Sequence, residues 1–399
     1  MLRYGSVFFD QSENPEDGGW ASIAGETAKR IAGPGDLAMD TIWLTNMGFS
    51  EFYKAGVGAY PHLRMDSFLK VTVAQMCNEL GIIPPYQMAA QHSVVIVSEI
   101  FNRVAIIVRR EFGIEIRNYN SLKDELAAKC RIPAVFSKEE FHDACKIAQQ
   151  TYSTCPTKPL RGTKTVALRK NRVAHAMEVC SAPVPGDKFT LYNGSHFGPA
   201  AKRVERICQY AEPVICNVSI KSIHNDMVDL IAFGSVPSKN RRQAVMRDWV
   251  TQVELMMLAE YADVTVETAY AGSGWDSLNS RVRIDPMPMD YLSYSYGLVA
   301  ENFRLAHSSD TASRGGKLFL SAQSLWLSAI DRFWSFVMAA KLGATGLTVS
   351  GYGGGAVNVQ AHPSQYEDIM RVAHSMQLTF PLWLPSAAHE SDILENGGD

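Results

Sequence analysis

The segment Leu318–Leu342 constrains the fold most, because it is apolar on nearly every side at helical spacing. Apart from Lys341 near its end, its only charges are Asp331 and Arg332. A helix that is apolar all round must be buried in a core or in an interface. The chain has 399 residues, 46% of them hydrophobic and 20% charged, so it is long enough for two domains, or one large one, around a sizeable core.

Helical spacing and capping signals predict several more helices. The predicted helices are Leu63–Leu80, Ala89–Phe112, Ser121–Lys129, Ser137–Gln150 with a capping box, Pro199–Tyr210, a helix from Ser238 or Asn240 that includes Arg247, and Pro363–Met376. Alternation of β-branched residues is sparse. The sequence therefore predicts a mainly α fold with two helical lobes, a cleft between them and extended arms. The expected boundaries are residues 1–20 for the N-terminal arm, 21–235 and 236–377 for the lobes, and 378–399 for the C-terminal arm and tail.

The cysteines and the apolar segments indicate the cellular compartment of the protein. Seven scattered cysteines without a C-x-x-C pair argue against a disulfide framework and a structural zinc site. Reduced thiols fit a cytosolic or nuclear compartment. The first twenty residues carry too short an apolar run for a signal peptide. Polar residues interrupt the most apolar window, Ser93–Val108, so we expect a buried helix and no membrane span.

Charge is unevenly distributed along the chain. The net charge is −3, but Lys and Arg clearly outnumber Asp and Glu between Lys158 and Arg247. Such asymmetry is typical of a nucleic-acid surface, although solvated helix faces give the same pattern. Lys and Arg can neutralise phosphates, and tyrosines can stack on bases. The candidate RNA-binding residues are Arg161, Lys164, Arg169, Arg172, Lys202, Arg203, Arg206, Arg241, Arg242, Arg247, Tyr294, Ser295, Tyr296, Arg304, Arg314 and Lys317.

Three short patterns could carry chemistry, and none has the context that it needs. Gly351–Ala356 matches a dinucleotide-binding turn, but no helix follows it, so a strand, glycine turn and strand or an irregular loop is expected. His142 and Cys145 lack a second metal-binding pair. Ser195 and His196 lack a nucleophile elbow. We therefore expect no catalytic activity, metal or cofactor.

The segment Pro286–Arg304, PMPMDYLSYSYGLVAENFR, resembles a known viral signature. Its LSYSYGLV run is similar to the L-x-Y-[SA]-Y-A-x-G run of rhabdovirus and paramyxovirus nucleoproteins, which belong to non-segmented negative-strand RNA viruses. The Tyr-Ser-Tyr core matches, whereas Gly297 and Val299 stand in place of the family's alanine and glycine. The resemblance implies two helical lobes that clamp single-stranded RNA, with Tyr294, Ser295 and Tyr296 at or near the cleft.

The resemblance and the charge pattern together predict a function. We expect a viral nucleoprotein that encapsidates single-stranded genomic RNA and assembles into a helical or ring-like nucleocapsid by exchanging its arms. Its expected partners are RNA, other copies of the chain, and a viral phosphoprotein or polymerase. It would be found in the virion and the host cytoplasm, with the nucleus left open. A shell-forming capsid protein and an α-rich enzyme without a recognised motif stay as alternatives.

Overall fold

The chain forms two compact units, each built from two separate stretches of sequence. Unit 1 comprises residues 1–131 and 279–306, and unit 2 comprises residues 132–278 and 307–399. This computed structural model describes residues 2–54, 60–80, 82, 90–117, 121–129, 139–150, 160–186, 188–224, 246–277, 291–308, 312–314, 317–319, 322–381 and 383–389. The predicted lobes differ from these units, and the predicted boundary between residues 235 and 236 lies outside the described residues.

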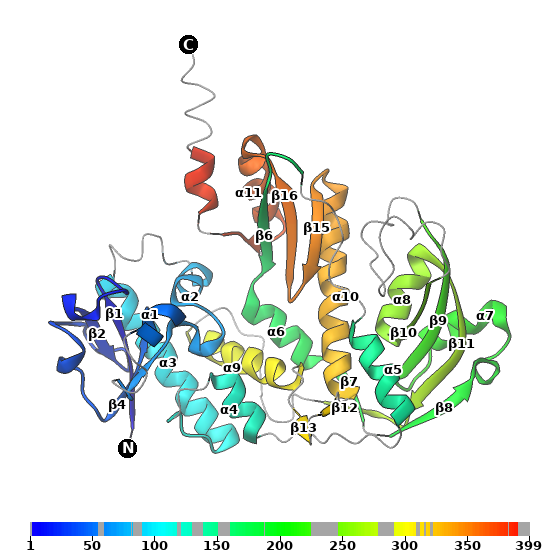
Figure 1. Cartoon of the computed structure of the whole chain (residues 1–399), viewed down its shortest axis with the longest axis horizontal. Helices are drawn as coiled ribbons and strands as arrows, with labels where there is room; N and C mark the ends of the chain where they lie inside the picture. Colours follow the sequence, from blue (N-terminus) through cyan, green and yellow to red (C-terminus); the bar gives the residue numbers. More distant parts are fainter. Residues whose placement is uncertain are drawn as a thin grey trace, which may run out of the picture. The chain divides into compact units, whose positions relative to one another are not determined.

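Unit 1 is organised around a five-stranded sheet with the strand order β3-β2-β1-β4-β5. Strands β1, β2 and β3 are antiparallel neighbours, whereas β4 is parallel to β1 and β5 is parallel to β4 (Figure 1). Its elements are β1 Arg3–Phe9, β2 Gly19–Ile23, β3 Lys29–Ile31, β4 Thr41–Thr45, α1 Phe49–Lys54, β5 Leu63–Arg64, α2 Val73–Glu79, α3 Ala90–Phe112, α4 Leu122–Lys129 and α9 Tyr291–Ser308.

Strand β1 shows why the prediction of a mainly α fold is wrong for unit 1. Val7 and Phe9 face a hydrophobic cluster on one side of the sheet, and the ring of Tyr4 meets Phe101 of α3. Because both faces are covered, the strand reads as a short apolar run without alternation. The expected N-terminal arm is therefore wrong over these residues: they form the central strand of a sheet.

Helix α3 confirms the long buried helix that the sequence predicted, and it packs on β1 and β2. By length and composition it could cross a membrane, but 61% of its apolar window is buried. The hydroxyl groups of Ser22 on β2 and Ser98 on α3 lie 2.8 Å apart. Burial against a sheet accounts for the apolar character of this helix.

Unit 2 contains two four-stranded antiparallel sheets, ordered β10-β9-β11-β8 and β15-β16-β6-β17. Its helices are α5 Glu139–Gln150, α6 Arg172–Ser181, α7 Ala200–Cys208, α8 Gln252–Tyr261, α10 Ala322–Ala344 and α11 Tyr366–Ser375. Its strands are β6 Lys164–Lys170, β7 Pro183–Pro185, β8 Phe189–Asn193, β9 Val214–Ile223, β10 Met246–Thr251, β11 Ala262–Gly272, β12 Trp275–Ser277, β13 Ala312–Arg314, β14 Lys317–Phe319, β15 Thr348–Gly353, β16 Ala356–Ala361 and β17 Leu378–Thr379.

Helix α10 joins the two sheets of unit 2 into one core. It contacts α5, α6, α8 and β15 along its length (Figure 1). Its two internal charges are both buried: Arg332 pairs with Glu254 of α8 at 2.7 Å and also donates to the carbonyl oxygen of Ala148 on α5. The predicted helix is thus confirmed, and its two central charges, Asp331 and Arg332, each have a partner inside the core.

The fold class is a correction to the sequence prediction, because the described residues form sheets as well as helices. The predicted helix that included Arg247 is wrong over Met246–Thr251, which pairs with β9 as strand β10. Strand β17 pairs with β6 of the same chain, so the expected C-terminal arm begins inside a sheet. The hairpin β15–β16 confirms the strand, turn and strand read at Leu347–Gln360.

Candidate functional site

The residues that carried the viral resemblance lie in the core of unit 1. Tyr294 and Ser295 are fully buried on α9, and the Tyr294 hydroxyl donates to Glu79 at 2.7 Å. Arg304 is 5% exposed and donates to the Glu301 carboxylate at 2.9 Å. Each of these three side chains is thus engaged within unit 1, which leaves Tyr294 and Ser295 no surface for a nucleotide.

The remaining member of that signature is Tyr296, which is partly exposed. Its phenol oxygen accepts a hydrogen bond of 2.5 Å from Arg110 of α3, and the same guanidinium lies 5.9 Å from the ring centroid. The contact ties α9 to α3. It also keeps the Arg110 pKa above its ordinary value, first through the Tyr296 hydrogen bond.

The other predicted cations are distributed over several elements of unit 2. Lys202 and Arg206 are exposed on α7, and Arg203 donates to the carbonyl oxygen of Val266 at 2.6 Å. Arg247, Arg314 and Lys317 lie on β10, β13 and β14, whereas Arg241 and Arg242 lie outside the described residues. Arg161, Lys164, Arg169 and Arg172 are spread along β6 and beyond its two ends.

Strand β6 leads directly into α6, and this junction lies at a groove in unit 2. Asn171 precedes α6, and its side-chain oxygen accepts from the backbone N–H of Ala174 at 3.1 Å, which is a helix N-cap. Lys170 is held at the end of β6 by its backbone bond to Gly355 and by an ion pair with Glu178 of α6. Lys170 and Asn171 are therefore fixed beside α10.

A groove of about 480 Å³ opens there, between the start of α6, one side of α10 and the end of α11. We call it the Lys170 groove. It is lined by Lys170, Asn171, Ala174, Trp334, Val337, Met338, Lys341, Ser375, Met376, Gln377 and Leu378. None of these lining residues is acidic. The groove is therefore electropositive, with amide and hydroxyl groups at its α11 end.

Two side chains of α10, Trp334 and Lys341, determine which ligands the groove can bind. The Trp334 indole is 39% exposed, and the Lys170 ammonium lies 5.0 Å from its ring centroid. Lys341 is exposed, and among the described residues no acidic group lies within ion-pair distance of it. An exposed ring flanked by cations can stack on a planar group that carries negative charge.

Gln377 at the other wall has a strained backbone. Its φ of +55° lies in the left-handed region, which is uncommon for residues other than glycine. The strain arises where the chain turns from α11 into β17, opposite Lys170. Such strain is often retained at ligand-binding positions.

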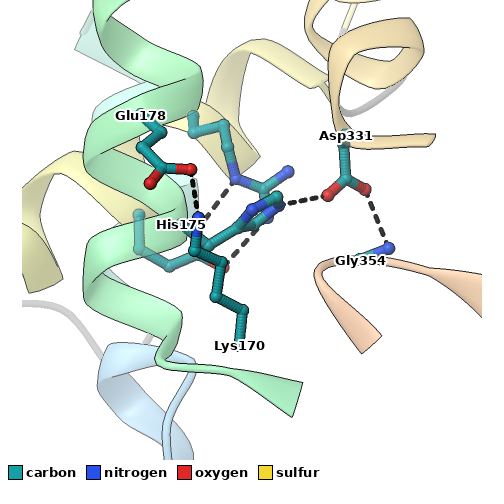
Figure 2. Close-up of polar contacts among 7 residues, drawn as sticks. Lys170, His175, Glu178, Asp331 and Gly354 are labelled. Atoms are coloured by element: carbon teal, nitrogen blue, oxygen red, sulfur yellow. Dashed lines mark hydrogen bonds and ion pairs between the residues drawn. The ribbon is translucent and has the colours of Figure 1, made fainter. Parts of the chain in front are cut away.

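A buried network beneath the groove fixes α6 against α10 and the β15–β16 turn. Figure 2 shows His175 of α6 facing Asp331 of α10, with ring nitrogen Nε2 2.5 Å from Oδ1. The second carboxylate oxygen accepts from the backbone N–H of Gly354 at 2.8 Å. His175 is 3% exposed and Asp331 8%. The network positions the two helices that form the groove walls.

The sequence analysis did not single out Trp334, Lys341 or Gln377, and Lys170 is not among its candidate RNA-binding residues. Because the sequence predicts a helix over Leu318–Leu342 that is buried on all sides, it does not indicate that Trp334 and Lys341 are exposed. The only available signal was position: Trp334, Met338 and Lys341 recur at a spacing of three to four residues, so they share one helix face.

Comparison with solved structures finds phi29 DNA polymerase. Its orthorhombic crystal form has a TM-score of 0.46 and 10% identity, over 90% of this chain and 80% of that chain. Its complex with single-stranded DNA has a TM-score of 0.43 and 9% identity over the same shares. No family model and no curated protein matches the chain. At these scores neither the activity nor the substrate of the polymerase transfers to this chain.

The predicted function is corrected by the fold. The nucleoprotein prediction is wrong, because the described residues do not form two helical lobes and because Tyr294 and Ser295, which carried the resemblance, are buried. The prediction of a protein without catalytic activity is withdrawn. The broader expectation of a nucleic-acid partner stays a prediction; the titles of two of the polymerase structures name bound DNA.

Proposed function

We propose that this chain binds nucleic acid through unit 2, with the Lys170 groove holding a phosphate and an adjacent base. One observation carries the proposal: the groove is lined by the exposed Trp334 ring, by Lys170, whose ammonium lies 5.0 Å from the ring centroid and pairs with Glu178, and by the exposed Lys341. Phosphates attract such cations, and bases stack on such rings without regard to sequence.

The polar end of the groove suits the remaining parts of a nucleotide. Ser375 and Gln377 offer a hydroxyl and an amide group, which can bond a sugar or a base edge. Met338 and Met376 add apolar surface that adapts to different rings. The mixture of one aromatic surface, two cations and a few neutral polar groups fits a nucleotide better than a purely apolar ligand.

Fluorescence anisotropy with labelled DNA and RNA oligonucleotides, each single- and double-stranded, tests the proposal. Lys341→Glu should weaken binding and lower the salt dependence of the association constant, by about 0.7 in log–log slope for one single-strand phosphate contact. Lys341 is exposed, so the fold should be retained. The DNA and RNA arms establish which nucleic acid is bound.

Lys202→Glu is the matched control, because Lys202 is also an exposed helical lysine and carries the same charge change on α7. We expect its affinity and salt slope to equal those of the parent chain. Equal weakening by Lys202→Glu and Lys341→Glu would show a diffuse charge effect and contradict a specific groove. No binding by the parent chain at low salt would also overturn the proposal.

A further inference from the structure

The other end of β6 repeats the combination of an exposed tryptophan and a lysine. Trp383 is 40% exposed, and the Lys164 ammonium lies 5.8 Å from its ring centroid. The edge of the indole is held by the buried ring of Tyr366 at a centroid distance of 5.7 Å. Trp383 is thus fixed in place while part of its surface faces solvent.

Lys164 is fixed by the sheet to the same degree as Lys170. It pairs with Ala361 of β16, and the neighbouring Thr163 hydroxyl donates to Gln360 at 3.0 Å. Lys164 is exposed, and among the described residues it has no acidic partner within ion-pair distance. The pair Lys164–Trp383, which we call the Trp383 site, is therefore another cationic, aromatic surface outside the Lys170 groove.

The two sites lie at opposite ends of one strand. Lys164 and Lys170 are the first and last residues of β6 and are an even number of residues apart, so they point to the same side of the strand. At about 3.3 Å per residue they are separated by ~20 Å. Leu378 pairs with Lys170 in the antiparallel strand β17, so the chain from Leu378 to Trp383 starts at the groove and ends at the Trp383 site.

We infer that the Trp383 site is a second nucleotide subsite, and that the ligand of unit 2 is a single strand that reaches from Trp334 to Trp383. The inference rests on the proposed function of the Lys170 groove. Two stacking surfaces select unpaired bases, because the faces of paired bases are already covered by their neighbours in a duplex. The ligand class is therefore single-stranded DNA or RNA rather than duplex.

The span sets a length threshold. At about 3.4 Å per stacked nucleotide, ~20 Å corresponds to roughly six nucleotides. Shorter strands can occupy only one of the two sites, whereas longer strands can occupy both. Affinity should therefore rise steeply as the oligonucleotide passes this length, since the second contact is made within the same complex.

The test measures affinity against oligonucleotide length by anisotropy for the full chain and for Trp383→Ala, Lys164→Glu and Trp383→Tyr. The parent chain should show the length step and bind duplex more weakly than single strands. Trp383→Ala should weaken the binding of long strands by about five-fold or more while leaving short strands unaffected. Lys164→Glu should act likewise, and Trp383→Tyr should keep most of the step because it keeps a stacking ring.

The outcomes separate the two proposals. A parent chain without a length step, or a Trp383→Ala variant that binds long strands as tightly as the parent does, overturns the second subsite and leaves the groove intact. Loss of both short- and long-strand binding in Lys341→Glu supports the groove on its own. If Trp383→Ala loses its fold, as read by circular dichroism, Lys164→Glu decides, because its side chain is exposed.

Discussion

Replacing only one partner of the buried ion pair between Arg332 and Glu254 should strongly lower the free energy of unfolding of unit 2. The side chains are 9% and 3% exposed, and a nitrogen and an oxygen lie 2.7 Å apart. Arg332→Met would leave the Glu254 carboxylate buried without its cation. Removing one partner of a buried pair costs about 3–5 kcal/mol. This is a large fraction of the stability of a typical domain, about 5–15 kcal/mol.

Two further variants give the pair energy by a double-mutant cycle. Glu254→Met also removes the cap of α8, since Glu254 accepts from the Thr251 backbone N–H at 3.1 Å, so it should cost about 1 kcal/mol more. The double variant Arg332→Met with Glu254→Met leaves no buried charge at this pair. It should therefore be more stable than either single variant.

Urea unfolding followed by tryptophan fluorescence measures these differences, because most of the tryptophans belong to unit 2. With an m-value of about 2 kcal/mol/M, Arg332→Met should lower the midpoint by roughly 1.5–2.5 M. Arg332→Lys should fall between the parent and Arg332→Met, because it keeps the charge but not the planar fork. A midpoint for Arg332→Met equal to the parent's would refute the reasoning.

Three further predictions concern single positions. Burial raises the pKa of Asp66 to about 6 from 3.8, so its native state holds a proton more tightly than the unfolded state. Unit 1 should therefore lose up to about 3 kcal/mol as pH rises through that interval, and Asp66→Asn should remove this dependence in urea titrations; an unchanged pH profile would contradict it. Gly355→Ala should destabilise unit 2 more than Gly354→Ala: both have positive φ, but a Cβ at Gly355 would lie 2.8 Å from the His175 ring, whereas one at Gly354 meets nothing within 4 Å. Equal thermal midpoints would count against this contact. Gln377→Gly should raise stability by about 1 kcal/mol while weakening oligonucleotide binding, and tighter binding would count against its place in the groove.

The sequence predicted the long helices well, for a physical reason. Ala90–Phe112 and Ala322–Ala344 are longer than any strand, and their apolar residues cover most of their circumference. Only a buried helix accounts for a pattern of that length. The hairpin at Thr348–Ala361 was also recognisable, because three consecutive glycines supply the positive φ values of its turn.

The sequence analysis failed mainly in predicting the strands. Val214–Ile223 is buried over its first three residues and then follows no strict alternation, so its pattern does not separate strand from helix. Met246–Thr251 continues directly into helix α8, and one continuous helix fits the same letters. Pairing between segments far apart in sequence decides both cases, and such pairing leaves no local signal.

The site was predictable only in part. The basic segment around β6 was identified from charge, and Lys164 belongs to the Trp383 site. The tryptophans that complete the two sites come from α10 and from the chain after β17, which are distant in sequence from β6. Tyr294 and Ser295 matched a viral signature by their letters, but the structure buries them. The sequence alone does not show whether a tyrosine in an apolar run packs in the core or stacks on a ligand.

The discontinuity of unit 1 has a consequence for biosynthesis. Helix α9 contributes Asn302, which donates to Leu69 at 2.8 Å, and Phe303, which packs on Phe112. During translation the first stretch of unit 1 leaves the ribosome long before α9 does, since the first half of unit 2 lies between them. The side of α3 that contacts α9 stays uncovered over that interval. A ribosome that pauses before α9 would therefore display an aggregation-prone intermediate, which makes this chain a candidate client for chaperones that bind nascent apolar surfaces.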